Sequence, residues 1–155
     1  MAVFLSRSVH KVDKKGRVSV PSAFRASLGD ELAKGLGLNM PVVGFPCIEV
    51  LPYAKIEERL TILDSLPVDE AEAMALAHRM LGTLAHVTLD GEGRIVLPDY
   101  LIEYAGIRDS ATFVGLGRTF QIWDAEALAV HDESTRLMAR DNIKLMRNKP
   151  VAGEG

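Results

Sequence analysis

The chain has 155 residues, 48% of them hydrophobic and 25% charged, with a formal net charge of −3 at pH 7. This composition is that of a globular protein, and the length suffices for one ordinary domain or two very small ones. The single cysteine, Cys47, excludes an internal disulfide and a cysteine-rich zinc site. Its thiol is either a small buried apolar group or a reactive nucleophile. The apolar runs are too short for a signal peptide or a membrane span, so we expect a soluble, cytoplasmic protein.

Charge is unevenly distributed along the chain. The first 29 residues hold six basic side chains against the single acidic Asp13, a local charge of +5. The basic residues are Arg7, Lys11, Lys14, Lys15, Arg17 and Arg25. Residues 57–72 have the opposite excess, with six acidic residues against Arg59. A basic face on an acidic body is typical of a nucleic-acid-binding protein, although a solvated charged surface gives the same count.

An internal repeat organises the sequence. The pentad Asp-Lys-Lys-Gly-Arg at residues 13–17 returns 77 residues later as Asp-Gly-Glu-Gly-Arg at residues 90–94. Each pentad is followed by the same pattern of alternating apolar residues and a proline, and the register extends to Gly29 and Gly106. A repeat of this length is too long for a solenoid unit. We therefore predict two small domains related by a pseudo-two-fold axis.

Each copy is predicted to contain two short strands, a short helix, a second pair of strands and a further helix. In the first copy these are strands 9–12 and 17–20, helix 22–28, strands 41–44 and 48–51, and helix 53–63. In the second they are a first strand near His86, then a strand after the second pentad, helix 99–105, strands 112–115 and 120–123, and a helix from Ala125. A proline at the start and a glycine just past the end define both short helices. Residues 30–40 are interpreted as a connection, which contains about five or six more residues than its counterpart.

The remaining segments complete the expected division of the chain. A helix over residues 68–81 joins the copies, residues 131–147 form either a helix or a mobile basic tail, and residues 149–155 are expected to be disordered. The expected units are residues 1–63 (first repeat and its helix), 64–83 (linking helix), 84–130 (second repeat) and 131–155 (C-terminal helix or tail).

The first pentad predicts a hairpin with a charged tip. Gly16 can adopt a positive φ, and the Asp13 carboxylate can accept hydrogen bonds from backbone amides across the turn. Arg17 can return to Asp13, while Lys14 and Lys15 are expected to point into solvent. A two-stranded ribbon with such a tip fits the major groove of DNA, where lysines meet phosphates and an arginine can bind guanine.

The second tip is chemically different. Gly91 and Glu92 replace the lysine pair, so this tip keeps Asp90 and Arg94 but loses the positive field. Arg94 is therefore either structural or a DNA contact. A contact of equal strength needs additional cations brought by folding, and the candidates are Arg7, Arg25 and Arg118.

No pattern of residues predicts catalysis. The four histidines fall into no metal-ligand spacing, and the Gly-x-Gly pairs lack the third glycine of a dinucleotide loop and the lysine of a P-loop. We expect neither an enzyme nor a metal or cofactor site.

The doubled pentad, the run Leu-Ile-Glu-Tyr-Ala-Gly at residues 101–106 and the run Phe-Gln-Ile-Trp-Asp at residues 120–124 resemble the MraZ family of bacterial transcriptional regulators. The resemblance covers roughly residues 4–145. It implies an α+β fold of two tandem AbrB-like swapped-hairpin β-barrel repeats with short helices, assembled into a ring that commonly has eight subunits. It also implies binding to repeated boxes upstream of the division and cell-wall gene cluster, which includes the regulator's own gene and is usually repressed.

The family's Asp-x-x-x-Arg motifs correspond to Asp13 and Arg17 in the first copy and to Asp90 and Arg94 in the second. The complete predicted DNA-binding set is Lys14, Lys15, Arg17, Arg94, Asp13, Asp90, Lys11 and Arg7. The expected partners are double-stranded DNA and further copies of the chain, with a location at the nucleoid. The alternative function is a ring-forming scaffold, or a module that binds RNA or protein.

Overall fold

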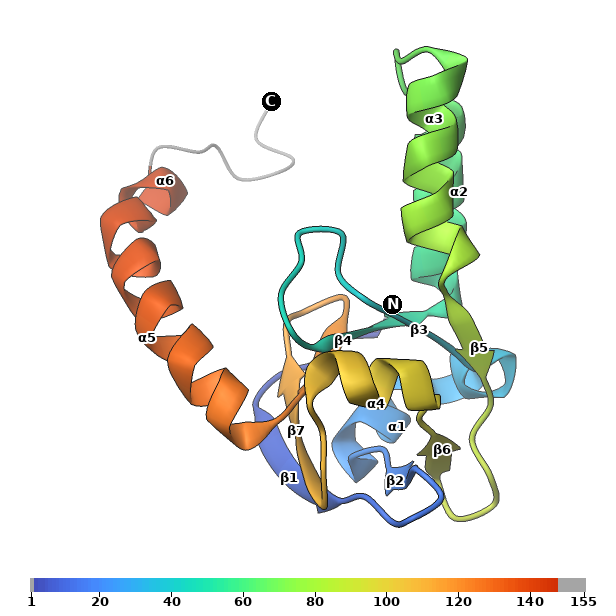
Figure 1. The fold of residues 1–155 in the computed structure, drawn as a ribbon, viewed down its shortest axis with the longest axis vertical. Coiled ribbons are helices and arrows are strands. Elements are labelled where there is room, and N and C mark those ends of the chain that lie inside the picture. Colours follow the sequence, from blue (N-terminus) through green and yellow to red (C-terminus); the bar gives the residue numbers. More distant parts are fainter. Residues whose placement is uncertain (1, 148–155) are drawn as a thin grey trace. The chain divides into compact units, whose positions relative to one another are not determined.

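The computed structural model describes residues 2–147 and divides the chain into two compact units, Met1–Ala125 and Glu126–Gly155 (Figure 1). The first unit holds the described strands of both copies of the repeat. The expectation of disorder at 149–155 lies outside the described residues.

The elements follow the repeat order. The first copy contains β1 (Arg7–Lys11), β2 (Arg17–Ser19), α1 (Ser22–Leu28), the 3-10 helix η1 (Gly29–Lys34), β3 (Leu36–Asn39), β4 (Ile48–Pro52) and α2 (Tyr53–Asp64). A helical connection follows, made of α3 (Glu70–Ala77) and the π-helix η2 (His78–Gly82). The second copy contains β5 (Ala85–Val87), β6 (Arg94–Val96), α4 (Asp99–Ala105), β7 (Ser110–Gly115) and β8 (Phe120–Trp123). Helices α5 (Ala125–Asn142) and α6 (Lys144–Arg147) complete the described chain, so residues 131–147 are largely helical.

The strands of the two copies are interleaved in shared sheets. One sheet has six strands in the order β1-β7-β8-β4-β3-β5, and the other is the pair β2-β6. Exchanging each strand of the first copy for its counterpart in the second simply reverses the six-strand order, as a pseudo-two-fold axis requires. The α+β class and the tandem AbrB-like swapped-hairpin repeats are thus confirmed, and the swap takes place within one chain.

The expected direct hairpin between the first two strands is wrong in its pairing. All five residues of β1 pair with β7, and β2 pairs with β6. Only a single bridge, from Val12 to Val18, joins the two strands that the sequence placed together. The reason is the repeat itself, because each strand has a second possible partner of the same apolar pattern in the other copy.

The predicted strand 41–44 is also wrong, since the third strand of the first copy is β3, at Leu36–Asn39. Residues 41–44 form a turn, in which the Gly44 N–H donates to the Pro41 carbonyl over 2.9 Å and Gly44 has φ 86°. A glycine inside β3 hides the strand pattern. A side-chain carbon at Gly37 would lie 2.7 Å from Cδ1 of Ile56, so helix α2 packs directly on the strand backbone.

The helices agree with the sequence pattern. Helix α1 has the predicted bounds, and α4 begins after Pro98 and ends before Gly106, whose φ of 66° is left-handed. The predicted helices at 53–63 and 68–81 correspond to α2 and to α3 with η2. A capping box between Asp69 and Glu72 starts α3.

One hydrophobic core lies between the two sheets. Val18 and Ile95 enter it from the two-stranded sheet, and Leu38 and Ile122 from the six-stranded sheet. Phe4, Phe24 and Phe120 pack around one another with ring centroids 4.9–5.2 Å apart. Burying each such side chain stabilises the folded state by on the order of 1.5–3 kcal/mol. Because the side chains come from both copies, both depend on the same core.

Candidate nucleic-acid interface

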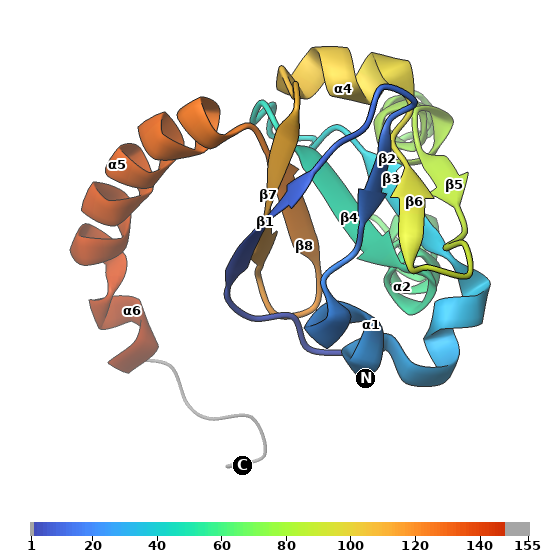
Figure 2. The same ribbon diagram turned by 90° about the horizontal axis from the view of Figure 1, so that it is seen from below.

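The two-stranded sheet presents an arginine from each copy on one face. Its register pairs Arg17 with Val96, Val18 with Ile95, and Ser19 with Arg94. The central pair is 1% exposed and faces the core. Because side chains alternate along a strand, Arg17 and Arg94 both lie on the outward face of the ribbon. Figure 2 shows β2 and β6 side by side on the surface of the first unit.

The first pentad forms a loop closed by its own aspartate. Oδ2 of Asp13 accepts a hydrogen bond of 2.6 Å from Nε of Arg17. Oδ1 accepts from the backbone N–H groups of Lys15 and Arg17, at 2.9 and 2.8 Å. The hydrogen bonds that the sequence predicts from backbone amides and from Arg17 to the Asp13 carboxylate are present.

The second pentad has the same geometry. Oδ2 of Asp90 accepts from Nε of Arg94 at 2.9 Å, and Oδ1 accepts from the N–H groups of Glu92 and Arg94, both at 2.9 Å. One difference is that Glu92 lies 3.7 Å from Nη2 of Arg94. The guanidinium of Arg94 therefore has a second acidic neighbour, which Arg17 lacks in the part of the chain that the structure describes.

Both aspartates are held in the ionised form. The hydrogen bond from the Arg17 backbone N–H is the main cause that lowers the pKa of Asp13, and the Arg94 N–H does the same for Asp90. The side-chain hydrogen bond to Asp90 raises the pKa of Arg94. Near neutral pH each loop therefore contains an ionised aspartate, which holds Nε of the loop's arginine by a hydrogen bond.

Two glycines tie the loops to opposite ends of the ribbon. Gly16 has φ 80° and Gly93 has φ 78°, a conformation that glycine adopts without strain. The Val20 N–H donates to the Gly93 carbonyl over 3.0 Å, and the equivalent residue of the other strand does the same for Gly16. Each loop is consequently anchored by the strand of the other copy.

The sequence of this chain is similar to known proteins over nearly its whole length. A relative from Rickettsia felis named transcriptional regulator MraZ is 38% identical over 148 residues, which cover 96% of this chain and 99% of the relative. The chain belongs to the MraZ family. Relatives of the same name from Rickettsia akari and Rickettsia rickettsii are 37% and 38% identical over the same share of each chain. The model of the MraZ family, described as "MraZ protein, putative antitoxin-like", matches residues 80–129.

The other predicted site residues of this MraZ-family chain lie in two places. Lys14 and Lys15 are exposed at the tip of the first loop, as expected. Lys11 and Arg7 are exposed on β1, which is an edge strand of the larger sheet rather than part of the ribbon. They are four positions apart along the strand, or about 13 Å at about 3.3 Å per residue, so only Lys11 adjoins the first loop.

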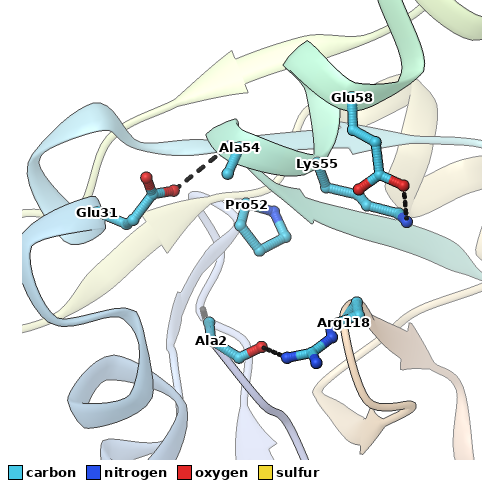
Figure 3. A pocket seen from close by; sticks show the side chains of 7 residues that line it. All are labelled: Ala2, Glu31, Pro52, Ala54, Lys55, Glu58 and Arg118. Carbon is cyan, nitrogen blue, oxygen red and sulfur yellow. Dashed lines mark hydrogen bonds and ion pairs between the residues drawn. The ribbon is translucent and has the colours of Figure 1, made fainter. Parts of the chain in front are cut away.

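Folding brings one of the three candidate arginines to the second loop. Arg25 packs against Gly93, and its Nε donates to the Val20 carbonyl over 3.1 Å. Arg118 instead lines a pocket beside the N-terminal segment (Figure 3). There its Nη1 donates a hydrogen bond of 3.3 Å to the carbonyl oxygen of Ala2. The sequence signal for Arg25 is its alignment with Ile102, which packs against Gly16 in the first loop.

The pocket in Figure 3 has a volume of about 230 Å³ and lies between the N-terminal segment, η1 and α2. Its charged groups already have partners. Lys55 pairs with Glu58 at 3.1 Å, and Glu31 accepts from the Ala54 N–H at 3.3 Å. Among residues 2–147 there is no cluster of potential metal ligands, and no helix there has the length and apolar character to cross a membrane.

Proposed function

We propose that this chain is a sequence-specific DNA-binding transcriptional regulator whose β2–β6 ribbon reads the major groove. The observation that carries the proposal is the pair Arg17 and Arg94 on one outward ribbon face, each fixed through Nε by an aspartate. A two-stranded ribbon fits the major groove, and an arginine with a free terminal fork binds O6 and N7 of guanine. Its relatives' name, transcriptional regulator, supports the same role.

The two arginines are proposed to differ in how strongly they bind a DNA base. Within residues 2–147, Nη1 and Nη2 of Arg17 have no hydrogen-bond partner, so the whole fork is available to a base. Arg94 shares its Nη2 with Glu92. Arg17 is therefore the principal base contact and Arg94 the second, while Lys14 and Lys15 bind phosphates beside the groove.

We further propose that the chain acts as a ring of several copies, with eight as the expected number. A ring repeats the ribbon and gains affinity on repeated boxes by multivalency. Exposed apolar side chains at the β3–β4 loop, Val42, Val43 and Phe45, offer surface for such contacts.

The proposed targets are boxes upstream of the chain's own operon, in the division and cell-wall gene cluster, with repression as the outcome at the nucleoid. The role is non-enzymatic, and residues 1–63 and 84–130 supply the two halves of the ribbon.

The test is a fluorescence-anisotropy titration of the full chain on a duplex from upstream of its own gene and on a scrambled duplex, across a salt series. Arg17→Ala is expected to lose about 1–3 kcal/mol of the preference for the native duplex. Lys55→Gln is the matched control, because it removes one positive charge from α2, which projects from the side of the unit opposite the ribbon (Figure 1). Absence of binding to either duplex at low salt would reject the DNA function in favour of a scaffold or an RNA- or protein-binding module. A monomeric mass in solution would reject only the ring.

A further inference from the structure

The second loop carries a cation that does not belong to its pentad. Arg25, in helix α1 of the first copy, places its guanidinium directly over Gly93. A side-chain carbon at Gly93 would lie 2.6 Å from Nη1 and 2.7 Å from Cζ of Arg25. The guanidinium thus occupies the space that the missing side chain leaves open.

The equivalent position beside the first loop is apolar. Ile102, in α4, is the counterpart of Arg25, and its Cδ1 would lie 3.3 Å from a side-chain carbon at Gly16. The two loops therefore have the same backbone conformation, but one has an apolar neighbour and the other a charged one. The loop that has two lysines packs against isoleucine, and the loop that has none packs against arginine.

The charges of the two loops explain this exchange. The first loop has three positive side chains against Asp13 alone, whereas the second has Asp90 and Glu92 against Arg94 alone. Without Arg25 the second end of the ribbon repels phosphate. Arg25 places one further cation beside the acidic pair of this loop.

The guanidinium of Arg25 is fixed in place but keeps hydrogen-bond donors available for a ligand. Its Nε donates to the Val20 carbonyl, which fixes the plane of the group at the end of β2. In the described part of the chain no carboxylate pairs with Arg25, and no acceptor binds Nη1 or Nη2. A fixed guanidinium with two free donors matches the geometry of a phosphate.

We propose that Arg25 is the phosphate-binding residue of the second loop and supplies there the contact that Lys14 and Lys15 supply at the first. This inference rests on the proposed function. Arg17 and Arg94 occupy the face of the ribbon, where bases are read, while Arg25 stands at the end of the ribbon, where a backbone passes. Each end of the ribbon then contributes phosphate contacts, from lysines at the first loop and from an arginine at the second.

The decisive variant is Arg25→Ile, because the same fold already accepts isoleucine at the equivalent position, Ile102. It is titrated with the wild type on the native and scrambled duplexes over a salt series. Loss of one phosphate contact should lower the salt slope, d log Kobs/d log[salt], by about 0.9 per bound site. At low salt the affinity for both duplexes should fall about 3- to 10-fold, since a phosphate contact contributes equally to all sequences. Their ratio should stay constant.

Arg25→Lys supplies a second measurement that stands even if the isoleucine variant fails to fold. Lysine keeps the point charge, so the salt slope should stay at the wild-type value. Lys55→Gln serves again as the charge control, with unchanged affinity and slope.

The alternatives give different results. An unchanged slope in Arg25→Ile, or an equal loss in Arg25→Ile and Arg25→Lys accompanied by a lower unfolding midpoint, would show a structural role and overturn the inference alone. A change in the native-to-scrambled ratio would make Arg25 a base reader and overturn it as well. If the wild type itself binds neither duplex, the proposed function fails and the inference fails with it.

Discussion

The backbone N–H of Leu97 donates a hydrogen bond of 2.8 Å to the carbonyl oxygen of Gly16. These residues belong to different copies of the repeat, so the first loop is held in place by the strand that follows the second. The two loops cannot move independently of the ribbon that joins them.

Replacing the loop glycines should have unequal effects on stability. Both positions have a positive φ, so alanine costs about 1–2 kcal/mol at either one from the backbone alone. At Gly16 the new carbon would also lie 2.8 Å from the Leu97 carbonyl, whereas at Gly93 its three nearest atoms belong to the side chain of Arg25, which can shift further than a backbone carbonyl. Urea unfolding should therefore show a larger loss of free energy for Gly16→Ala than for Gly93→Ala. An equal loss, or the reverse order, would contradict this account of the loops.

The loop aspartates should titrate at unusually low pH. Hydrogen bonds from backbone N–H groups lower the pKa of Asp13 and Asp90 below the ordinary value of 3.8. Because the folded-state pKa is the lower one, their contribution to stability is complete above about pH 3.8 and is lost as the pH falls through the lowered value. Carbon-13 NMR titration of the carboxylates measures this directly, with Asp13→Asn and Asp90→Asn assigning the signals. A pKa at or above 3.8 for either residue would exclude the proposed hydrogen bonding in solution.

The thiol of Cys47 should be unreactive in the folded protein. The side chain is fully buried, and desolvation together with the charge of Glu49 raises its pKa to about 12. Since the thiolate is the nucleophile, a chromogenic disulfide reagent at pH 8 should react slowly with the native chain and rapidly in denaturant. Equal rates in both conditions would show that the thiol is accessible.

Neither copy of the repeat should fold as a monomer. A cut between α2 and α3, after Leu66, separates β1 from β7 and β2 from β6. Fragments 1–66 and 67–155 should each lack cooperative thermal unfolding at low concentration, and mixing them should restore it. Circular dichroism monitors the transition, and sedimentation reports the mass. A cooperative transition from either monomeric fragment would mean that the copies are independent domains.

Local features of this fold could be predicted from the sequence, because neighbouring residues determine them. A proline and a glycine define α1, and the hydrogen bonds of the Asp13 loop span only four residues. The strand pairing could not be predicted from the apolar pattern alone, since two copies with the same pattern offer each strand more than one partner. Strand β3 is not apparent in the sequence because it has only four residues, and one of them is Gly37, which lets Ile56 approach the backbone but weakens a strand pattern.

The candidate site divides in the same way. The roles of Asp13 and Arg17 within their loop are sequence-local and were foreseen. Arg25 is only one of three arginines that the sequence offers for the second loop, because it lies on a helix of one copy and contacts the loop of the other. In the sequence the two copies differ here only in that Arg25 of the first aligns with Ile102 of the second. The sequence alone does not say which of the two loops each side chain contacts.

Glu49 and Gln121 face each other where β4 pairs with β8, at equivalent positions of the two copies. Two separate identical chains would place the same side chain there twice, and two glutamates directly opposite would repel. Here Glu49 instead binds Nη1 of Arg59 at 2.8 Å, while Gln121 accepts from Nε1 of Trp123 at 2.7 Å. Covalent fusion of the halves thus lets a mutation change one side of the axis and spare the other, a freedom that a homodimer encoded by a single half-length gene does not have.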